Sequence, residues 1–334
     1  KNTEFNEITL ADSARRSHGG FWASRSTEVE DALKKLKPDL LYLNGYSNAI
    51  QIQSWLFAVK NKIPFMIRCD GDNIGKKKPW KSFLRRQFVK PITQSASRVT
   101  FQGRTNRDFW IANGAREEQL VWVPCVSDSE VFRKNSSIDQ LAIDECRRSQ
   151  GASPDDTVFV VSGKLESRKR PADAIKALSE CKNSKIKLWF LGSGVLEAEL
   201  QHLKETLGLS SQVTFLGFRN QSEMPSILKS ADVLLHPSEF DPWPYAILDG
   251  AICGLALLLS SKTGSTADWI FEPACGMSFE CGNIEQLKDC MLRLSRDKEE
   301  LSIFKNRALE RSKEYTEERF AEIFEELVFD SLKV

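Results

Sequence analysis

The sequence predicts an α/β protein of two doubly wound domains, each with a parallel sheet. Short apolar segments alternate with segments of helical periodicity along most of the chain, and the apolar segments end in polar or glycine-containing loops. Alternating strands and helices of this kind form parallel sheets with helices on both faces. The length of 334 residues is enough for two domains that each bury a core of their own.

The first half of the chain has four clear strand segments with helical segments between them. The strands are expected at 40–43, 63–68, 98–101 and 120–124, with a weaker candidate at 5–10. The helices are expected at 27–36, 47–60 and 105–113. Ser17 to Gly20 is interpreted as a flexible turn, because no apolar strand precedes it as a phosphate loop would require. We interpret 1–135 as the first domain and the polar segment 136–156, with a short helix at 138–148, as a linker.

The second half continues the same alternation and predicts a second domain at 157–314. Its strands are expected at 157–162, 185–191, 212–216, 231–235, 255–259 and 276–279. Its helices are expected at 172–181, 195–207, 222–230, 244–253, 284–294 and 298–311. A last helix in 315–334 has apolar residues at amphipathic spacing, which permits packing back on the first domain.

Composition excludes several classes of function. The net charge is +1, with 28% charged and 41% hydrophobic residues, so nothing points to nucleic acid. The eight cysteines contain no C-x-x-C pair and the histidines number three, which favours reduced structural thiols in a cytoplasmic protein and predicts no metal site. No apolar run approaches the roughly 18 residues that span a bilayer.

One stretch, from Ser230 to Ser261, carries a pattern with chemical meaning. A buried strand ends at His236-Pro237-Ser238, a polar loop follows, and Pro244 opens a helix. Asp241 in the loop and Asp249 in the helix are separated by seven residues. The loop lies at the carboxyl end of a parallel strand, where open α/β sheets bind ligands, and the helix N-terminus favours an anion. Alternatively, Asp241 caps the helix and Asp249 is an ordinary acid.

A second anion site is predicted after the strand at 157–162. Gly163 to Pro171 contains four cations within seven residues, just before a helix. Loop amides, a helix N-terminus and lysine charges together favour a phosphate group. Such fixed cations would stabilise the negative charge that builds on a departing diphosphate. The alternative is a solvated basic turn.

Both stretches resemble the donor-site signature of retaining family-four glycosyltransferases of the GT-B fold. His236-Pro237-Ser238, Ala251-Ile252-Cys253-Gly254 and the following strand occupy matching positions, although aspartates replace both of the family's glutamates and Pro244 replaces a glycine. The resemblance implies two facing Rossmann-like domains. It also implies that Lys164 and Lys169 bind the donor diphosphate, that Asp249 binds ribose and that Asp241 binds the donor hexose. We interpret His236 as a structural histidine at the end of a buried strand.

The same resemblance extends the donor site to other loops. Gly192-Ser193-Gly194 lacks the third glycine of a dinucleotide fingerprint, so a tight turn beside the donor is the better interpretation. Gly217-Phe218-Arg219 occupies the family position that borders the nucleotide base. The full set of predicted donor-binding residues is Gly163, Lys164, Lys169, Gly192, Gly194, Gly217, Phe218, Trp243, Tyr245 and Asp249.

The first domain departs from the family pattern in two places. Many relatives begin with a strand and a Gly-rich loop, and we expect that this first βα unit is missing here. Asn44 stands where relatives often have a histidine near the reacting carbon, and it can hydrogen-bond a hydroxyl but cannot exchange protons near neutral pH. The acceptor-side candidates are Arg68, Asp70, Asp72 and Arg104, with a plain polar loop as the alternative for the first three.

The segment Lys76 to Pro91 has seven basic residues and no acid, with Trp80, Phe83, Leu84 and Phe88 at helical spacing. Such a helix can lie on an anionic membrane surface, which would make the protein peripheral on the inner face. A solvated helix that packs on the sheet needs the same apolar stripe, so both interpretations stay open.

The predicted function is retaining transfer of a hexose from a nucleotide-diphosphate sugar to a glycan or lipid-linked acceptor, without a metal or another cofactor. Asp241, Lys164, Lys169 and Asn44 are the expected catalytic residues. Two alternatives remain: a related sugar-nucleotide epimerase or inverting transferase, and a non-catalytic relic that only binds nucleotide sugars.

Overall fold

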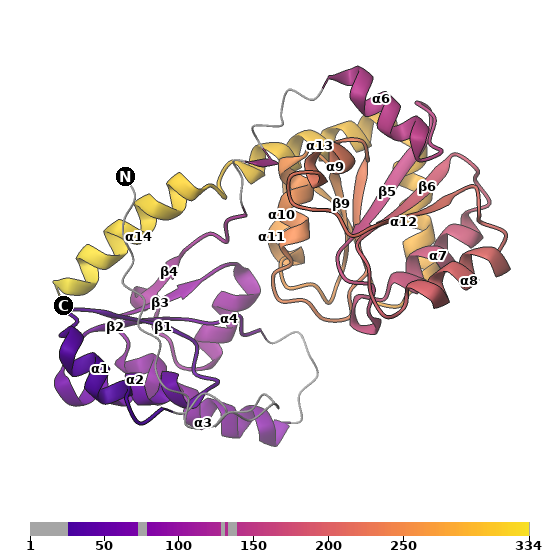
Figure 1. Cartoon of the computed structure of the whole chain (residues 1–334). Coiled ribbons are helices and arrows are strands. Elements are labelled where there is room, and N and C mark those ends of the chain that lie inside the picture. Colours follow the sequence, from indigo (N-terminus) through magenta and orange to yellow (C-terminus); the bar gives the residue numbers. More distant parts are fainter. Residues whose placement is uncertain (1–25, 73–78, 128–130, 133–138, 334) are drawn as a thin grey trace.

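The computed structural model describes residues 26–72, 79–127, 131–132 and 139–333, and these form two α/β lobes joined by crossing segments (Figure 1). The predicted strand at 5–10 and the turn at 17–20 lie outside the described residues, as do the first three residues of the basic segment. The expectation of a missing first βα unit therefore stays a prediction.

The first lobe holds a four-stranded, all-parallel sheet in the order β1-β2-β3-β4. Its strands are β1 (Leu41–Asn44), β2 (Phe65–Arg68), β3 (Arg98–Phe101) and β4 (Leu120–Trp122). Its helices are α1 (Val29–Leu36), α2 (Ala49–Asn61), α3 (Pro79–Ser95) and α4 (Arg104–Ala112), with a 3-10 turn at Glu117–Gln119. One core lies between the sheet and α2, α3 and α4, around Ile67, Val99 and Trp110.

The second lobe holds a six-stranded, all-parallel sheet in the order β10-β9-β8-β5-β6-β7. Its strands are β5 (Thr157–Ser162), β6 (Ile186–Leu191), β7 (Val213–Gly217), β8 (Val233–His236), β9 (Ala256–Ser260) and β10 (Gly276–Phe279). The helix α6 (Gln140–Ser149) precedes β5. The remaining helices are α7 (Pro171–Cys181), α8 (Glu197–Thr206), α9 (Met224–Lys229), α10 (Tyr245–Ile252), α11 (Thr266–Trp269), α12 (Ile284–Arg296) and α13 (Lys298–Ser312), with a 3-10 turn at Ser167–Lys169.

Two apolar layers enclose the larger sheet. Strands β5, β8 and β9 are buried along their full length, which explains why their sequences are continuous apolar runs rather than alternating ones. One layer packs under α7, α8 and α12, and the other under α9, α10 and α11, while α13 contributes to both. This double cover confirms the predicted doubly wound architecture.

The strand order of the larger sheet reverses between β5 and β8. From β5 the chain proceeds outward through β6 and β7, then returns to the other side of β5 and proceeds outward through β8, β9 and β10. The helices that follow β5 and β8, α7 and α10, pack on opposite faces of the sheet, which leaves a crevice at the carboxyl ends of these strands. Such a switch point is where open α/β sheets bind ligands.

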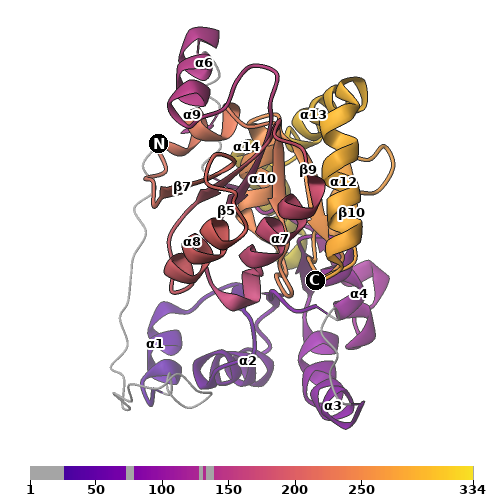
Figure 2. The same cartoon turned by 90° about the vertical axis from the view of Figure 1, so that its right-hand side faces the viewer.

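The last helix, α14 (Glu317–Leu332), leaves the second lobe and lies against the first (Figures 1 and 2). Leu327 is buried with Met66 and Val123, and Phe324 makes an edge contact with Tyr42 at a centroid distance of 5.2 Å. The chain therefore crosses between the lobes twice.

Several local expectations were wrong at their boundaries. Asn44 is the last residue of β1 rather than the first loop residue. The basic segment forms α3, which continues through Pro91 to Ser95, because the burial of Val89, Ile92 and Thr93 outweighs the hydrogen bond that proline removes. The helix after Gly194 begins at Glu197, and the short helix α11 was not predicted. All eight cysteines are described and none is in a disulfide. Among the described helices, none is long and apolar enough to cross a membrane.

Candidate active site

The loops that follow β5 and β8 meet at the switch point. The Nζ of Lys169 forms an ion pair with Asp241 Oδ2, and both side chains are mostly buried. Two hydrogen bonds to backbone carbonyls fix the two loops to each other, since the Arg168 side chain donates from Nη1 to the Phe240 carbonyl at 2.6 Å and the Glu239 N–H donates to the Arg168 carbonyl at 2.9 Å. The two stretches singled out in the sequence thus form one site.

His236 completes a buried group with this ion pair. Its Nε2 lies 3.3 Å from Asp241 Oδ2. Burial lowers the pKa of His236, so the imidazole is neutral near neutral pH and donates to the carboxylate. Burial alone would raise the pKa of Asp241, but hydrogen bonds from His236 and Lys169 and the lysine charge lower it. His236 therefore orients Asp241, which adds a specific role to the structural one expected.

Asp249 is buried on α10, the helix that begins after the loop of residues 237–244, which is named the donor loop after the resemblance described above. Its Oδ1 accepts a hydrogen bond of 2.5 Å from the Ser127 hydroxyl, which belongs to the segment that crosses from the first lobe. Burial raises the pKa of Asp249 to about 6. Ser127 could not be predicted as a site residue, because its contact with Asp249 joins residues far apart along the chain.

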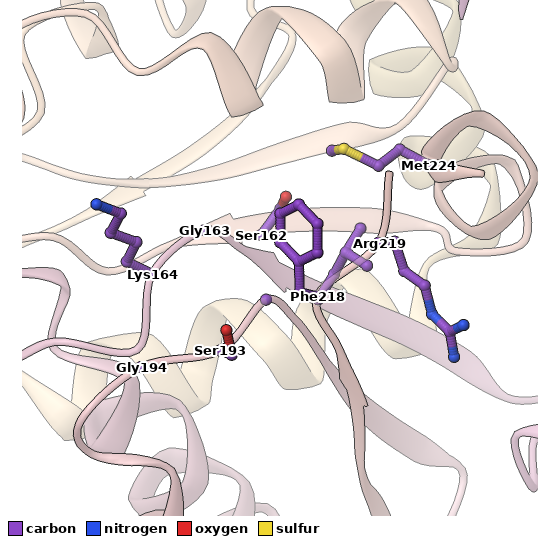
Figure 3. Close-up of a pocket in the computed structure, with 10 residues that line it drawn as sticks. Ser162, Gly163, Lys164, Ser193, Gly194, Phe218, Arg219 and Met224 are labelled. Atoms are coloured by element: carbon purple, nitrogen blue, oxygen red, sulfur yellow. The ribbon is translucent and has the colours of Figure 1, made fainter. Parts of the chain in front are cut away.

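A cavity of about 400 Å³ lies at the carboxyl ends of β5, β6 and β7 (Figure 3). Lys164 stands on one side of it and Arg219 and Met224 on the other, with the Phe218 ring between them. Phe218 is 73% exposed, which is unusual for a large apolar side chain. The cavity is lined by Ser162, Gly163, Lys164, Leu191, Gly192, Ser193, Gly194, Phe218, Arg219 and Met224. Of the predicted donor residues, it gathers Gly163, Lys164, Gly192, Gly194 and Phe218.

Two glycines of this cavity are required by close backbone packing. A Cβ on Gly192, whose φ is +140°, would lie 2.1 Å from the Gly163 carbonyl oxygen. A Cβ on Gly194 would lie 2.4 Å from the Leu165 carbonyl oxygen. These glycines let the turn after β6 pack against the loop that carries Lys164. The tight-turn interpretation of Gly192 and Gly194 agrees with this packing.

Two aromatic residues near the end of the donor loop, Trp243 and Tyr245, have different surroundings. Trp243 lies against Tyr315, at a centroid distance of 5.9 Å, and Tyr315 also packs on Trp269 and Trp122. Trp122 ends β4 of the first lobe, so this aromatic cluster joins the two lobes where the chain crosses back. Tyr245 is half-exposed at the first turn of α10.

The acceptor-side candidates are spread along the cleft edge of the smaller sheet. Arg68 ends β2, and its Nη2 lies 3.5 Å from Asp70 Oδ1, while its Nε is buried without a hydrogen-bond partner. Asp70 also accepts a hydrogen bond from Gln102, Asp72 is buried, and the Asn44 side chain is exposed. Arg104 contacts the second lobe instead: its guanidinium lies 3.6 Å from the Phe271 ring centroid.

With this geometry in place, comparison with known proteins identifies the family. The model of the family described as Glycosyl transferases group 1 matches residues 142–311, about half of the chain. The chain belongs to this family. The matched region contains every predicted donor-side residue, whereas Asn44, Arg68, Asp70, Asp72 and Arg104 lie outside it.

Curated relatives of this family member match over part of their length. An uncharacterized glycosyltransferase of Methanocaldococcus jannaschii is 32% identical over 119 residues, covering 35% of the chain and 30% of the relative. The UDP-Gal:alpha-D-GlcNAc-diphosphoundecaprenol alpha-1,3-galactosyltransferase of Escherichia coli is 30% identical over 148 residues, covering 42% of the chain and 37% of the relative. The alignments thus span less than half of the relatives' length.

Solved structures confirm the GT-B fold. The Anabaena protein HepE in complex with UDP superposes with a TM-score of 0.75 at 17% identity, covering 93% of this chain and 84% of HepE. A glycosyltransferase from Rickettsia africae superposes with a TM-score of 0.73 at 13% identity, covering 91% of this chain and 80% of that one.

The residues that the structure describes contain no cluster of possible metal ligands. Among those residues, no group of three or more His, Cys, Asp or Glu side chains is placed to hold a metal ion. The cleft instead presents lysine charges, with Lys164 and Lys169 on one loop.

Proposed function

We propose that the chain is a retaining glycosyltransferase that transfers a hexose from a nucleotide-diphosphate sugar to a lipid-linked or glycan acceptor. One observation carries the proposal: the Lys164–Lys169 loop and the Asp241–Asp249 segment meet at the switch point of the larger sheet, beside a cavity of about 400 Å³. Ligand sites concentrate at such positions. Retention of configuration rests on the resemblance of these two segments to retaining enzymes.

In this proposal the two lysines hold the diphosphate. Lys164 lines the cavity, and Lys169, five residues further along the same loop, forms an ion pair with Asp241. An ammonium group has three donors, so Lys169 can bind a phosphate oxygen without leaving Asp241. Negative charge grows on the diphosphate as the glycosidic bond breaks, and cations that are already in place stabilise it most. We therefore assign leaving-group stabilisation to lysine charges and propose no metal or other cofactor.

Asp249, Phe218 and Asp241 bind the ribose, the base and the hexose of the donor in this proposal. Asp249 accepts hydrogen bonds from the ribose, and Phe218 covers the base from its exposed position at the cavity. Asp241 is held by Lys169 and His236 through the same oxygen, Oδ2, so Oδ1 is the oxygen offered to the hexose. In this proposal Tyr245 binds the donor and Asn44 hydrogen-bonds a hydroxyl near the reacting carbon.

The acceptor is proposed to be a lipid-linked glycan. The E. coli relative is named for an acceptor with a diphosphoundecaprenol group, and a Campylobacter jejuni relative is named for a diphospho-undecaprenol acceptor as well. Arg68, with its unpartnered Nε, is the strongest candidate for contact with an acidic acceptor from the first lobe. Asp70 and Asp72 would bind sugar hydroxyls.

The helix α3 fits this class of acceptor. Trp80, Phe83, Leu84 and Phe88 are 57%, 60%, 56% and 45% exposed, so the stripe does not pack inside the protein. The described part of the helix carries basic side chains and no acid. Apolar side chains in the interface with cations at anionic headgroups would hold the protein on a membrane surface and place the acceptor site near its lipid.

Membrane attachment can be tested by sedimentation with vesicles. We expect the protein to bind vesicles of phosphatidylcholine with 30% phosphatidylglycerol (about one anionic lipid in three) more tightly than pure phosphatidylcholine, and 0.5 M salt to weaken this binding. The double variant Phe83→Ser/Leu84→Ser should lose it. A matched control is Ile303→Ser/Leu309→Ser on α13, where both residues are also partly exposed. Equal binding of both double variants would exclude α3 as the attachment site.

The function itself is tested by nucleotide release from a panel of UDP-, GDP-, ADP- and dTDP-sugars, with and without a short-chain polyprenyl-diphosphate N-acetylglucosamine acceptor. Acceptor-dependent release with an α-linked product from an α-linked donor supports retention, and a β-linked product supports the inverting alternative. Interconversion of nucleotide sugars without acceptor indicates an epimerase. Donor binding without release or conversion identifies a binding relic.

A further inference from the structure

One contact between the lobes reaches the donor loop through a single residue, Gly264. At the N-terminus of α4 in the first lobe, the Thr105 hydroxyl donates a 2.9 Å hydrogen bond to the carbonyl of Gly264, which follows β9 in the second lobe. The neighbouring N–H of Arg104 donates to Asp268 Oδ1 at 3.0 Å. Gly264 lies in the loop after β9, and Asp268 lies in the short helix α11 that follows this loop.

The same glycine holds the donor loop on its other side. The Gly264 N–H donates a 2.8 Å hydrogen bond to the Asp241 carbonyl, and Asp241 pairs with Thr263 in a parallel bridge. A Cβ on Gly264 would lie 2.0 Å from the carbonyl oxygen of Pro242, so the two segments are in direct backbone contact. The segment Thr263–Gly264 is therefore sandwiched between α4 and the donor loop.

The interface around this contact is closely packed. A Cβ on Gly103 would lie 2.3 Å from the Trp243 ring and 2.4 Å from Asp268 Oδ2. On the far side, Arg311 Nη1 donates to the Asp268 carbonyl at 2.7 Å and fixes α11 to the body of the second lobe. A small shift of the α4 N-terminus should therefore also move the loop around Gly264 and the donor loop, because closely packed segments shift together.

We infer that Thr105 is a positioning residue for the donor-phosphate site. The hydrogen bonds run from Thr105 to Gly264 and from Gly264 to Asp241, and the Asp241 carboxylate holds the Lys169 ammonium. Through these bonds, Thr105 of the first lobe positions Lys169 of the second lobe. Contact between the lobes and binding of the diphosphate therefore stabilise each other. The inference rests on the proposed function, in which Lys169 binds the diphosphate.

The alternative role for Thr105 is purely structural. A hydrogen bond that only joins the lobes would stabilise the fold without changing affinity for a ligand in the second lobe. A positioning residue changes nucleotide affinity, and it does so only while Lys169 is present. The two roles therefore differ in a binding measurement and in a double-mutant cycle.

The experiment measures UDP binding by calorimetry for wild type, Thr105→Val, Thr105→Ser and a control, Thr206→Val. Thr206 donates its hydroxyl to a carbonyl one turn earlier in α8, so the control loses the same kind of bond within one helix. We expect Thr105→Val to weaken UDP binding about 3- to 10-fold, the range for one lost hydrogen bond. Thr105→Ser and the control should stay within about twofold of wild type. Hydrogen exchange at residues 261–270 should slow on UDP binding, and less so in Thr105→Val.

The cycle uses Lys169→Met. In that background Thr105→Val should cause no further loss of UDP affinity, because its effect passes through the lysine. Unchanged affinity in the single Thr105→Val variant, or an equal loss with and without Lys169, would overturn the inference. If wild type binds neither UDP, GDP, ADP nor dTDP, the proposed function fails at the first step, and that outcome is distinct from an unresponsive Thr105.

Discussion

The two sheets of this protein differ in how much of a binding site they define by themselves. The larger sheet reverses its strand order between β5 and β8, so the two loops that carry Lys169 and Asp241 leave adjacent strands. The four described strands of the smaller sheet follow chain order without a reversal. Its cleft edge carries scattered polar groups such as Arg68 and Asn44. The reversal in the larger sheet brings Lys169 and Asp241 together in one crevice. In the smaller sheet, the polar side chains stay apart along the cleft edge.

The two lobes also differ in their dependence on each other. The larger sheet is covered on both faces by helices of its own lobe, while the smaller sheet borrows α14 from the end of the chain for one face. We therefore expect changes in the larger lobe to affect donor chemistry, and changes in the smaller lobe to affect acceptor use or the stability of the docked arrangement, except at Thr105, which contacts Gly264 across the junction.

The largest effect is expected at the switch point. Lys169→Met removes the cation that pairs with Asp241 at the proposed diphosphate site and should lower kcat by about 100- to 1,000-fold. The measurement is steady-state nucleotide release with the best donor of the panel. Lys176→Met, an exposed lysine on α7, is the matched control and should retain activity. Similar rates for both variants would remove Lys169 from the chemistry.

The next effect concerns the borrowed helix. Leu327→Ala opens a cavity between α14 and the smaller sheet, where Leu327 is 3% exposed, and should destabilise the protein by about 2–4 kcal/mol. Leu332→Ala, near the exposed end of the same helix, should cost less than about 0.5 kcal/mol. Urea unfolding measures both. Equal midpoints would mean that α14 does not support the smaller lobe.

The third prediction concerns pH at the donor site. Burial raises the pKa of Asp249 from its ordinary value of 3.8 to about 6, and the proposed contact with ribose needs the carboxylate as acceptor. UDP affinity should therefore fall as the pH drops below about 6. Asp249→Asn should bind UDP about tenfold more weakly at pH 7.5. Its affinity should fall less than that of wild type as the pH drops, since only the protonation of the UDP phosphate at about pH 6 then remains.

The same shift has a consequence for stability. Because the pKa of Asp249 is higher in the folded than in the unfolded protein, the folded protein keeps this proton up to a higher pH. Its stability therefore falls as the pH rises from about 4 to about 6. Asp249→Asn removes this cost and should be about 1–2 kcal/mol more stable than wild type at pH 7.5. Asp289→Asn, an exposed acid on α12, should change neither property. A variant no more stable than wild type would contradict the assigned burial cost.

The smallest effect is expected on the rim. Arg68→Gln should raise the KM for a polyprenyl-diphosphate acceptor about 3- to 10-fold and leave acceptor-independent donor hydrolysis unchanged. Arg116→Gln lies before β4, at the opposite edge of the same sheet, and serves as control. A parallel loss of donor hydrolysis in Arg68→Gln would place this arginine on the donor side and blur the contrast between the lobes.

The sequence by itself determined the element order and the donor motifs of the larger lobe. Its strands are short apolar runs because they are buried on both faces, and the runs at 157–162 and 276–279 were located to the residue. Gly163 to Arg170 and Asp241 to Asp249 are local patterns, so spacing along the chain was enough to find them.

Only the tertiary structure decided which distant residues meet. The Lys169–Asp241 pair follows from strand order, which no local pattern encodes. Ser127 on Asp249, Thr105 on Gly264 and the cluster around Tyr315 join residues far apart along the chain, and each depends on how the two lobes face each other. Local propensity acts within a few residues, whereas these contacts form only when the whole chain is packed, which is why the pairs of residues that meet at the junction between the lobes could not be predicted from the sequence.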